Sequence, residues 1–138
     1  ITNPLPILHR GVGCAIENYD TLYNDVAAAY QLALRWKISG DTAYADKAVQ
    51  VMDAWLGTLQ EISCPNGTSS DFILLAGIQG FQFANVGEIM RTYPGWDANN
   101  FTRFQNMMRN IFFPVNFGSL IHNERFAKIP DSLSINAN

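Results

Sequence analysis

The sequence has few of the residues that build metal centres: among 138 residues there are two cysteines and two histidines. Cys14 and Cys64 are far apart and neither belongs to a CxxC pair, so we expect no metal site and no cofactor. Charged residues make up 15% of the chain, the net charge is −3 and no basic cluster occurs, which argues against nucleic acid as a partner. No apolar run reaches the roughly 20 residues of a membrane span, so we expect no membrane partner either.

Apolar residues are plentiful by contrast. They make up 48% of the chain, which is enough for a packed core. The charged fraction is also too low for a disordered chain. The first residues, ITNPLPILHRG, contain no initiator Met, and we expect them to be the interior or mature start of a longer protein. In this irregular lead-in, His9 and Arg10 are expected to be a solvated loop pair rather than ligand contacts.

Two sequons for N-glycosylation begin at Asn66 and Asn100. Motifs this short also arise by chance. Together with the two cysteines they favour a secreted, extracellular glycoprotein that contains a Cys14–Cys64 disulfide. The alternative is a cytosolic protein with two buried free thiols.

A helical hairpin is expected near the start of the chain. Apolar residues recur at three- and four-residue steps from about Asp20 to Ser39 and again from about Thr42 to Glu61. Gly40 suits the left-handed position after the first helix, and Asp41 suits the N-cap of the second. A connection this short makes the two helices antiparallel neighbours.

The chain is organised around the stretch from Ser69 to Tyr93, which is predicted to be one long helix. It has an apolar stripe, a row of small residues and a row of polar residues, the last being Gln79, Gln82, Asn85 and Glu88. Because a glycine inside a helix costs roughly 0.5–1 kcal/mol relative to alanine, its three glycines suggest close approach by another helix or a ligand. The amides either link helices or line a wet groove.

A second hairpin follows. Pro94 and Gly95 end the central helix, and another helix is expected to begin at Asp97 or Ala98 and to stop at Pro114. Residues 62–68 and 115–138 are expected to be loop-like. Each hairpin thus joins one broadly apolar helix to one amphipathic helix, as an α/α toroid requires.

The sequence therefore predicts an all-α fold in which helical hairpins form part of an incomplete α/α toroid. Residues 1–138 are interpreted as the N-terminal part of a single toroid domain, completed by the rest of the polypeptide or by a second chain. The alternative is a small four-helix unit that covers its apolar faces in an oligomer.

Two stretches together resemble a known family. ALRWKISGDTAYADKAVQVMDAWLGTL is similar to the first outer hairpin of alginate-lyase-like polysaccharide lyases, which have an α/α toroid. FILLAGIQGFQFANVGEIMRTYPGWDANNFTRFQNMM is similar to the segment that follows it. The likeness covers about residues 20–123.

The resemblance implies β-elimination on a uronic-acid polymer, such as alginate or a glucuronan, without a metal. This reaction needs a group that neutralises the substrate carboxylate, a base for the C5 proton and an acid for the leaving oxygen. The resemblance points to His122 as the base and to Asn123 at the carboxylate, with Gln79 or Asn85 as a further sugar contact. The tyrosine that commonly serves as the acid is not found, because every tyrosine lies at or before position 93.

Some assignments remain open at this stage. Trp96 either stacks on a sugar ring or anchors the start of a helix in the core. The whole protein is either a lyase, a non-catalytic carbohydrate-binding or scaffold protein, or a glycoside hydrolase on the same kind of ring. A hydrolase needs two carboxylates roughly 5–10 Å apart, for which Glu88 and Glu124 are the candidates.

Overall fold

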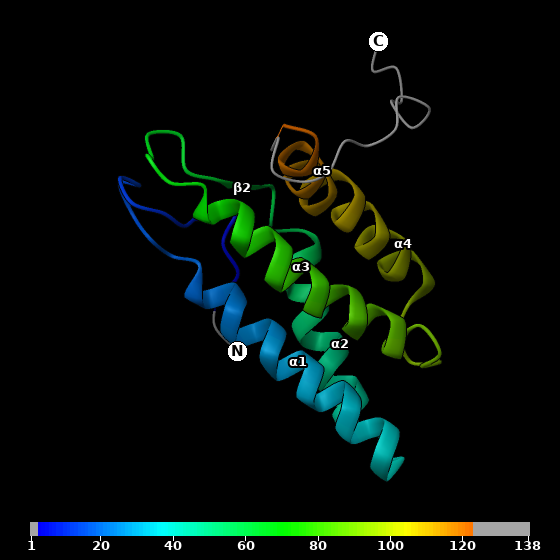
Figure 1. The fold of residues 1–138 in the computed structure, drawn as a ribbon. Coiled ribbons are helices and arrows are strands. Elements are labelled where there is room, and N and C mark those ends of the chain that lie inside the picture. Colours follow the sequence, from blue (N-terminus) through cyan, green and yellow to red (C-terminus); the bar gives the residue numbers. More distant parts are fainter. Residues whose placement is uncertain (1–2, 123–138) are drawn as a thin grey trace, which may run out of the picture.

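The structure, a computed structural model, describes residues 3–122 and is mostly helical (Figure 1), which confirms the predicted all-α class. The elements are, in chain order, β1 (Ile7–His9), α1 (Asp20–Ser39), α2 (Thr42–Leu56), β2 (Glu61–Ser63), α3 (Asp71–Met90), α4 (Ala98–Met107), the π-helical turn η1 (Met108–Phe112) and α5 (Phe113–His122).

Local capping signals set the helix ends. Gly40 follows α1 in the left-handed conformation, with φ of 73°, and its N–H donates to the carbonyl of Trp36. Asp41 caps α2 by accepting a hydrogen bond from the Ala43 N–H at 3.0 Å. Asp97 caps α4 in the same way, accepting from two amides of its first turn.

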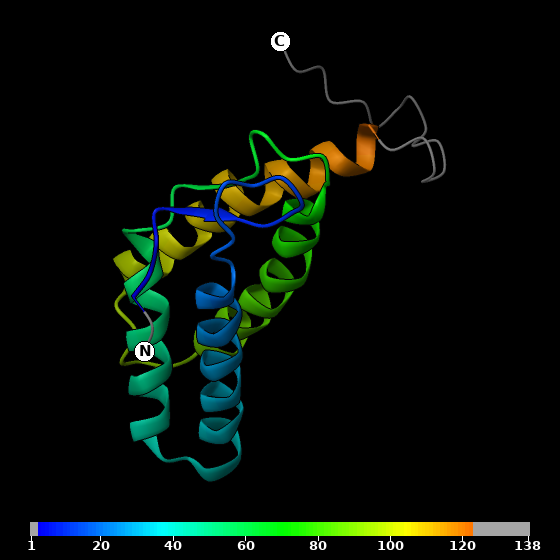
Figure 2. The same cartoon turned by 90° about the vertical axis from the view of Figure 1, so that its left-hand side faces the viewer.

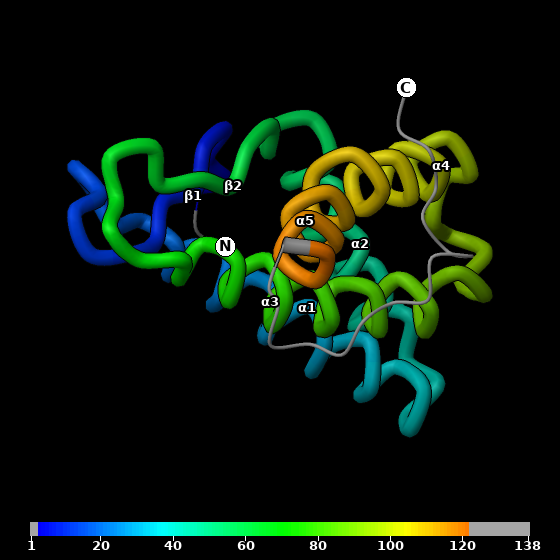
Figure 3. Tube along the Cα trace, turned by 45° about the horizontal axis from the view of Figure 1, so that its top comes forward, coloured from blue at the N-terminus to red at the C-terminus, as the bar shows by residue number. Residues whose placement is uncertain are grey.

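The helices are arranged so that α1 and α3 lie side by side and run in the same direction, while α2 returns antiparallel to α1 (Figure 2). In the view of Figure 1, α2 lies behind α1 and α3. The continuous rod of α4, η1 and α5 crosses over α3 and also contacts α2 (Figure 3). Consecutive hairpins therefore pack against each other.

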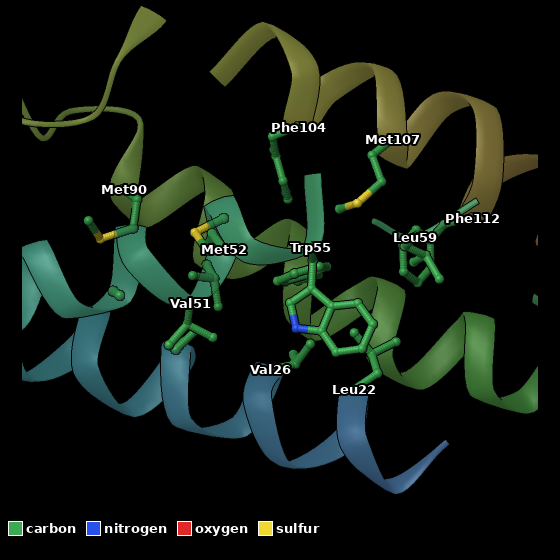
Figure 4. Close-up of a cluster of buried hydrophobic side chains, with 14 of the residues drawn as sticks. Leu22, Val26, Val51, Met52, Trp55, Leu59, Met90, Phe104, Met107 and Phe112 are labelled. Atoms are coloured by element: carbon green, nitrogen blue, oxygen red, sulfur yellow. The ribbon is translucent and has the colours of Figure 1, made fainter. Parts of the chain in front are cut away.

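The core forms where these helices meet, around Trp55 of α2 (Figure 4). Trp55 is fully buried, and its indole Nε1 donates a hydrogen bond of 3.0 Å to the buried Asp25 carboxylate of α1. The buried side of α2 also includes Val51 and Met52. An indole N–H in a core needs such an acceptor, because an unpaired buried donor costs about 1–3 kcal/mol.

A short parallel sheet joins the two ends of the first hairpin. β1 pairs with β2 so that Leu8 lies opposite Ile62, and both side chains are buried. The helix α2 ends at Leu56, five residues earlier than predicted, and β2 occupies part of the expected continuation and loop. The sheet therefore fixes the N-terminal segment on top of the helices.

Pro114 does not end the second hairpin as the sequence predicts. The N–H of Phe113 donates to the carbonyl of Met108, five residues back, which is the wider π-helical spacing. In a regular α-helix the proline ring would clash with the carbonyl four residues earlier, and the wider turn changes this spacing. Pro114 is therefore the second residue of α5. Residues 115–122, expected to be a loop, are helical.

The helix α3 is apolar on two faces. Its core face is buried, while Leu74, Ile78 and Phe81 form an exposed stripe on the opposite face, and Phe81 is 68% exposed. Within residues 3–122, α3 is the one helix long and apolar enough by length and composition to cross a membrane, which the sequence analysis did not anticipate. A core helix has the same composition, and α3 packs against α1, η1 and α5.

Candidate functional site

A groove runs between α3 and the rod of α4, η1 and α5. Its volume is about 760 Å³. Gly80, Ala84 and Gly87 of α3 form one wall, and the other carries Phe104 and Phe112 among its residues. This largely apolar groove is here called the α3 groove.

The glycines of α3 let aromatic rings approach its backbone. A Cβ added to Gly87 would lie 2.3 Å from Cε1 of Phe104, and one added to Gly80 would lie 2.9 Å from Cδ1 of Phe112. Both rings also pack edge to face on Phe83, with centroids 5.7 and 6.2 Å away. Of the two explanations that the sequence left open for the glycine row, the structure supports approach by another helix.

Few polar groups line the α3 groove. Glu88 forms an exposed ion pair of 3.0 Å with Arg91, and Arg109 is exposed on the other side. Asn116 donates to the carbonyl of Ala76 at 3.3 Å, so its amide is partly engaged. Within the described lining, the carboxylate of Glu88 is the single one.

The predicted sugar-contact amides lie outside the lining of the α3 groove. Gln79 is 1% exposed, and its Oε1 has no hydrogen-bond partner among the described residues. Asn85 is half-buried, and the intervening Gln82 also has a buried, unpartnered Oε1. Gln79 is thus enclosed in the core in this structure, and Asn85 is the more accessible of the two candidates.

Trp96 lies in the core, which favours the second of the two interpretations that the sequence left open. Its side chain is 6% exposed and packs against Phe101 and Phe104, with ring centroids 5.2 and 5.7 Å away. Its Nε1 donates a hydrogen bond of 2.9 Å to Asp53 of α2. Trp96 therefore anchors the start of α4, the alternative that the sequence left open.

The two predicted catalytic residues fall at the edge of the described chain. His122 is the last residue of α5. Asn123 lies outside the described residues, as does Glu124, the second carboxylate of the hydrolase hypothesis. The continuation of the helix to His122 places the predicted base on the same rod that borders the α3 groove.

The other histidine has a structural environment that the sequence did not indicate. The backbone N–H of His9 donates to Oδ1 of Asn18 at 2.7 Å, and its ring Nδ1 lies 2.9 Å from the carbonyl oxygen of Ser63. The neighbouring Arg10 guanidinium lies over the ring of Tyr19, 4.6 Å from its centroid. His9 is thus half-buried and ties β1 to β2, rather than being a solvated loop residue.

Tyr93, the last tyrosine of the chain, makes contacts with the first hairpin through both its hydroxyl and its ring. Its hydroxyl donates a hydrogen bond to Asp46 of α2, and its ring packs edge to face on Trp36, 5.0 Å between centroids. The hydrogen bond to Asp46, together with desolvation and the charge of Asp46, raises the pKa of Tyr93. These contacts tie the end of α3 to the first hairpin.

The predicted disulfide is present. Cys14 and Cys64 are bonded across 50 residues of sequence, with their Cα atoms 5.4 Å apart. Gly11 and Gly13 beside it adopt positive φ values of 138° and 88°, which allows the lead-in to fold back over the loop after β2. The alternative of two free thiols is therefore wrong.

Comparison with known proteins identifies the family. The sequence model of the family described as alginate lyase matches residues 9–113, which is more than half of the chain. The chain belongs to the alginate lyase family. No curated protein and no solved structure matches.

This membership confirms the resemblance on which the sequence analysis relied, and it implies a polysaccharide lyase with a polysaccharide substrate. The matched range contains both cysteines, the whole of α3 and both walls of the α3 groove up to Phe113. The match ends at residue 113, so it does not cover the predicted catalytic pair, His122 and Asn123.

Proposed function

We propose that this member of the alginate lyase family is an extracellular polysaccharide lyase that cleaves a uronic-acid polymer, such as alginate or a glucuronan, by β-elimination. The observation that carries this proposal is the family match over residues 9–113. The Cys14–Cys64 disulfide supports secretion, because such bonds persist in oxidising compartments.

We propose His122 as the base that removes the C5 proton of the uronate. Asn123 donates hydrogen bonds to the substrate carboxylate, which stabilises the negative charge that develops when the proton leaves. The electron pair of the C5–H bond forms a C4–C5 double bond, and the C4–O bond breaks. An acid supplied elsewhere in the protein protonates the departing oxygen.

A histidine is suited to this role because its pKa lies near neutral pH. The helical continuation through Pro114 supports the assignment, since it puts position 122 at the end of an ordered rod rather than within a long loop. Asn85 is the amide of α3 that remains as a candidate sugar contact, because it is only half-buried.

The test is ultraviolet absorbance of the unsaturated product, followed over time with full-length protein and a panel of uronans. His122→Ala should lower the rate by about 10²–10⁴-fold, the usual contribution of a general base. Lys47→Ala, an exposed change on the outer face of α2, is the control and should keep the rate. Unchanged elimination in folded His122→Ala would remove His122 from the mechanism.

The products separate the alternatives. A hydrolase would release reducing ends without new absorbance, and a binding protein would leave the polymer intact. The hydrolase has the weaker support, because Glu88 is exposed and paired with Arg91 and no second carboxylate lines the described α3 groove.

A further inference from the structure

We propose that the two sequons have different fates: Asn66 carries an N-linked glycan in the folded protein, and Asn100 does not. This inference rests on the proposed secretion of the protein, but not on its lyase activity. It is carried by the contacts of the two asparagine side chains.

The Asn66 side chain is accessible to a modifying enzyme. It is exposed in the turn after β2, where the N–H of Gly67 donates to the carbonyl of Cys64 at 3.0 Å. No hydrogen bond holds the Asn66 side chain within the described structure. The hydroxyl of Thr68, the third residue of the sequon, is exposed and makes only a long contact of 3.4 Å to the Val12 carbonyl.

The surroundings of Asn66 also leave space for a sugar. A small pocket of about 170 Å³ borders this residue, and its other walls include His9, Ile16 and Pro65. Ile16 is 64% exposed, which leaves apolar surface open to solvent. The first sugar of a glycan on Asn66 would therefore border this pocket.

Asn100 is engaged on both sides of its amide. It is half-buried in the first turn of α4, and its Nδ2 donates to Oδ2 of Asp53 at 2.8 Å. Its Oδ1 accepts from the guanidinium of Arg103 at 3.1 Å, and the hydroxyl of Thr102 in the same sequon donates to the Ala98 carbonyl at 3.0 Å. A sugar on Nδ2 would crowd Asp53 and Arg103, which both contact this amide.

The same Asp53 carboxylate also accepts from the indole of Trp96 at 2.9 Å. Displacing Asp53 would therefore disturb both side chains that attach the start of α4 to α2. The structure assigns the Asn100 amide to holding these two helices together.

The modification is a transfer from a polyprenyl-diphosphate-linked oligosaccharide. The bond between the anomeric carbon and the diphosphate oxygen breaks, and that carbon bonds to Nδ2 of Asn66. The amide loses one proton, and the lipid diphosphate leaves. The donor and its transferase belong to the secretory pathway.

The experiment is secretion of the full chain from a glycosylating eukaryotic host, followed by enzymatic release of N-glycans in heavy-oxygen water. Peptide mass spectrometry then reads the occupancy of each sequon, since a released site becomes aspartate. Thr68→Ala and Thr102→Ala each destroy one sequon and leave its asparagine in place, so they are matched variants.

We expect the glycan in wild type to map to Asn66, to be lost in Thr68→Ala and to be retained in Thr102→Ala. Occupancy of Asn100 in the secreted, folded pool would overturn the assignment, as would an unmodified Asn66 in that pool. Elimination assayed on the same preparations keeps the two proposals separate, because occupancy is read without any enzymatic turnover.

Discussion

Alanine substitution at the glycines of α3 tests how the α3 groove is built. A methyl group on Gly87 would lie 2.3 Å from Cε1 and 2.7 Å from Cζ of Phe104. Carbon atoms pack at about 3.5–4.0 Å, so the overlap exceeds 1 Å by this measure. Phe104 is 5% exposed and is held between Phe83 and Trp96, so its ring has little room to move away.

Two opposing effects set the magnitude for Gly87→Ala. Overpacking a core costs about 1–3 kcal/mol. Replacing glycine by alanine inside a helix returns up to about 1 kcal/mol. We expect a net loss of about 1–2 kcal/mol in the free energy of unfolding. Gly80→Ala should lose less, because its nearest neighbour, Phe112 Cδ1, is 2.9 Å away.

Gly118 in α5 provides the control, because a Cβ added there meets nothing within 4 Å. Gly118→Ala should raise the free energy of unfolding by up to about 1 kcal/mol through helix propensity alone. Urea denaturation of the variants and wild type measures these differences. If Gly87→Ala proves as stable as Gly118→Ala, the close packing of Phe104 on α3 is refuted.

Three further predictions concern the contacts outside the groove. Changing Cys14 and Cys64 together to serine should lower the free energy of unfolding by about 4 kcal/mol, from the entropy of a loop of 50 residues, and an equal midpoint for the variant and the oxidised wild type in urea would contradict this. Asp53→Ala removes the acceptor of both Trp96 and Asn100 and should lower the free energy of unfolding by about 2–3 kcal/mol, measured by urea denaturation. A loss near zero would show that these two hydrogen bonds contribute little. The pKa of Tyr93 is higher in the folded protein than its usual value of about 10. The stability that the protonated hydroxyl confers is therefore complete below about pH 10 and is lost as the pH rises through the raised pKa. Tyr93→Phe should abolish this loss of stability at alkaline pH, and an identical pH profile of stability for the variant and wild type would argue against the bond to Asp46.

Features controlled by neighbouring residues could be predicted from the sequence. Asp41 caps a helix and Gly40 ends one, through bonds within a few residues, so their signals are local and were correct. The prediction that the helix stops at Pro114 was wrong, although it relied on the same kind of local signal. The effect of the proline is normally local too, but here a π-helical turn beside it forms where Phe112 packs on Gly80, a contact distant in sequence.

The site was harder to predict because burial is a property of the assembled fold. The polar row on α3 does not reveal that Gln79 is enclosed while Asn85 is half-exposed. Trp96 had two readings, and only the position of Asp53 on α2 decides between them. The β1–β2 pairing joins three-residue strands 54 positions apart, such as Leu8 and Ile62, and strands this short have no detectable alternation.

The π-helical turn η1 also keeps both ends of the rod facing α3. A π-helical turn holds one residue more than an α-helical turn, and each residue of an α-helix advances by about 100° around the axis. One extra residue in a regular α-helix would therefore rotate everything after it by about 100°. In η1 the wider turn takes up that residue, so the helix that follows keeps nearly its rotational phase. Phe104 before the turn and Asn116 after it thus both contact α3.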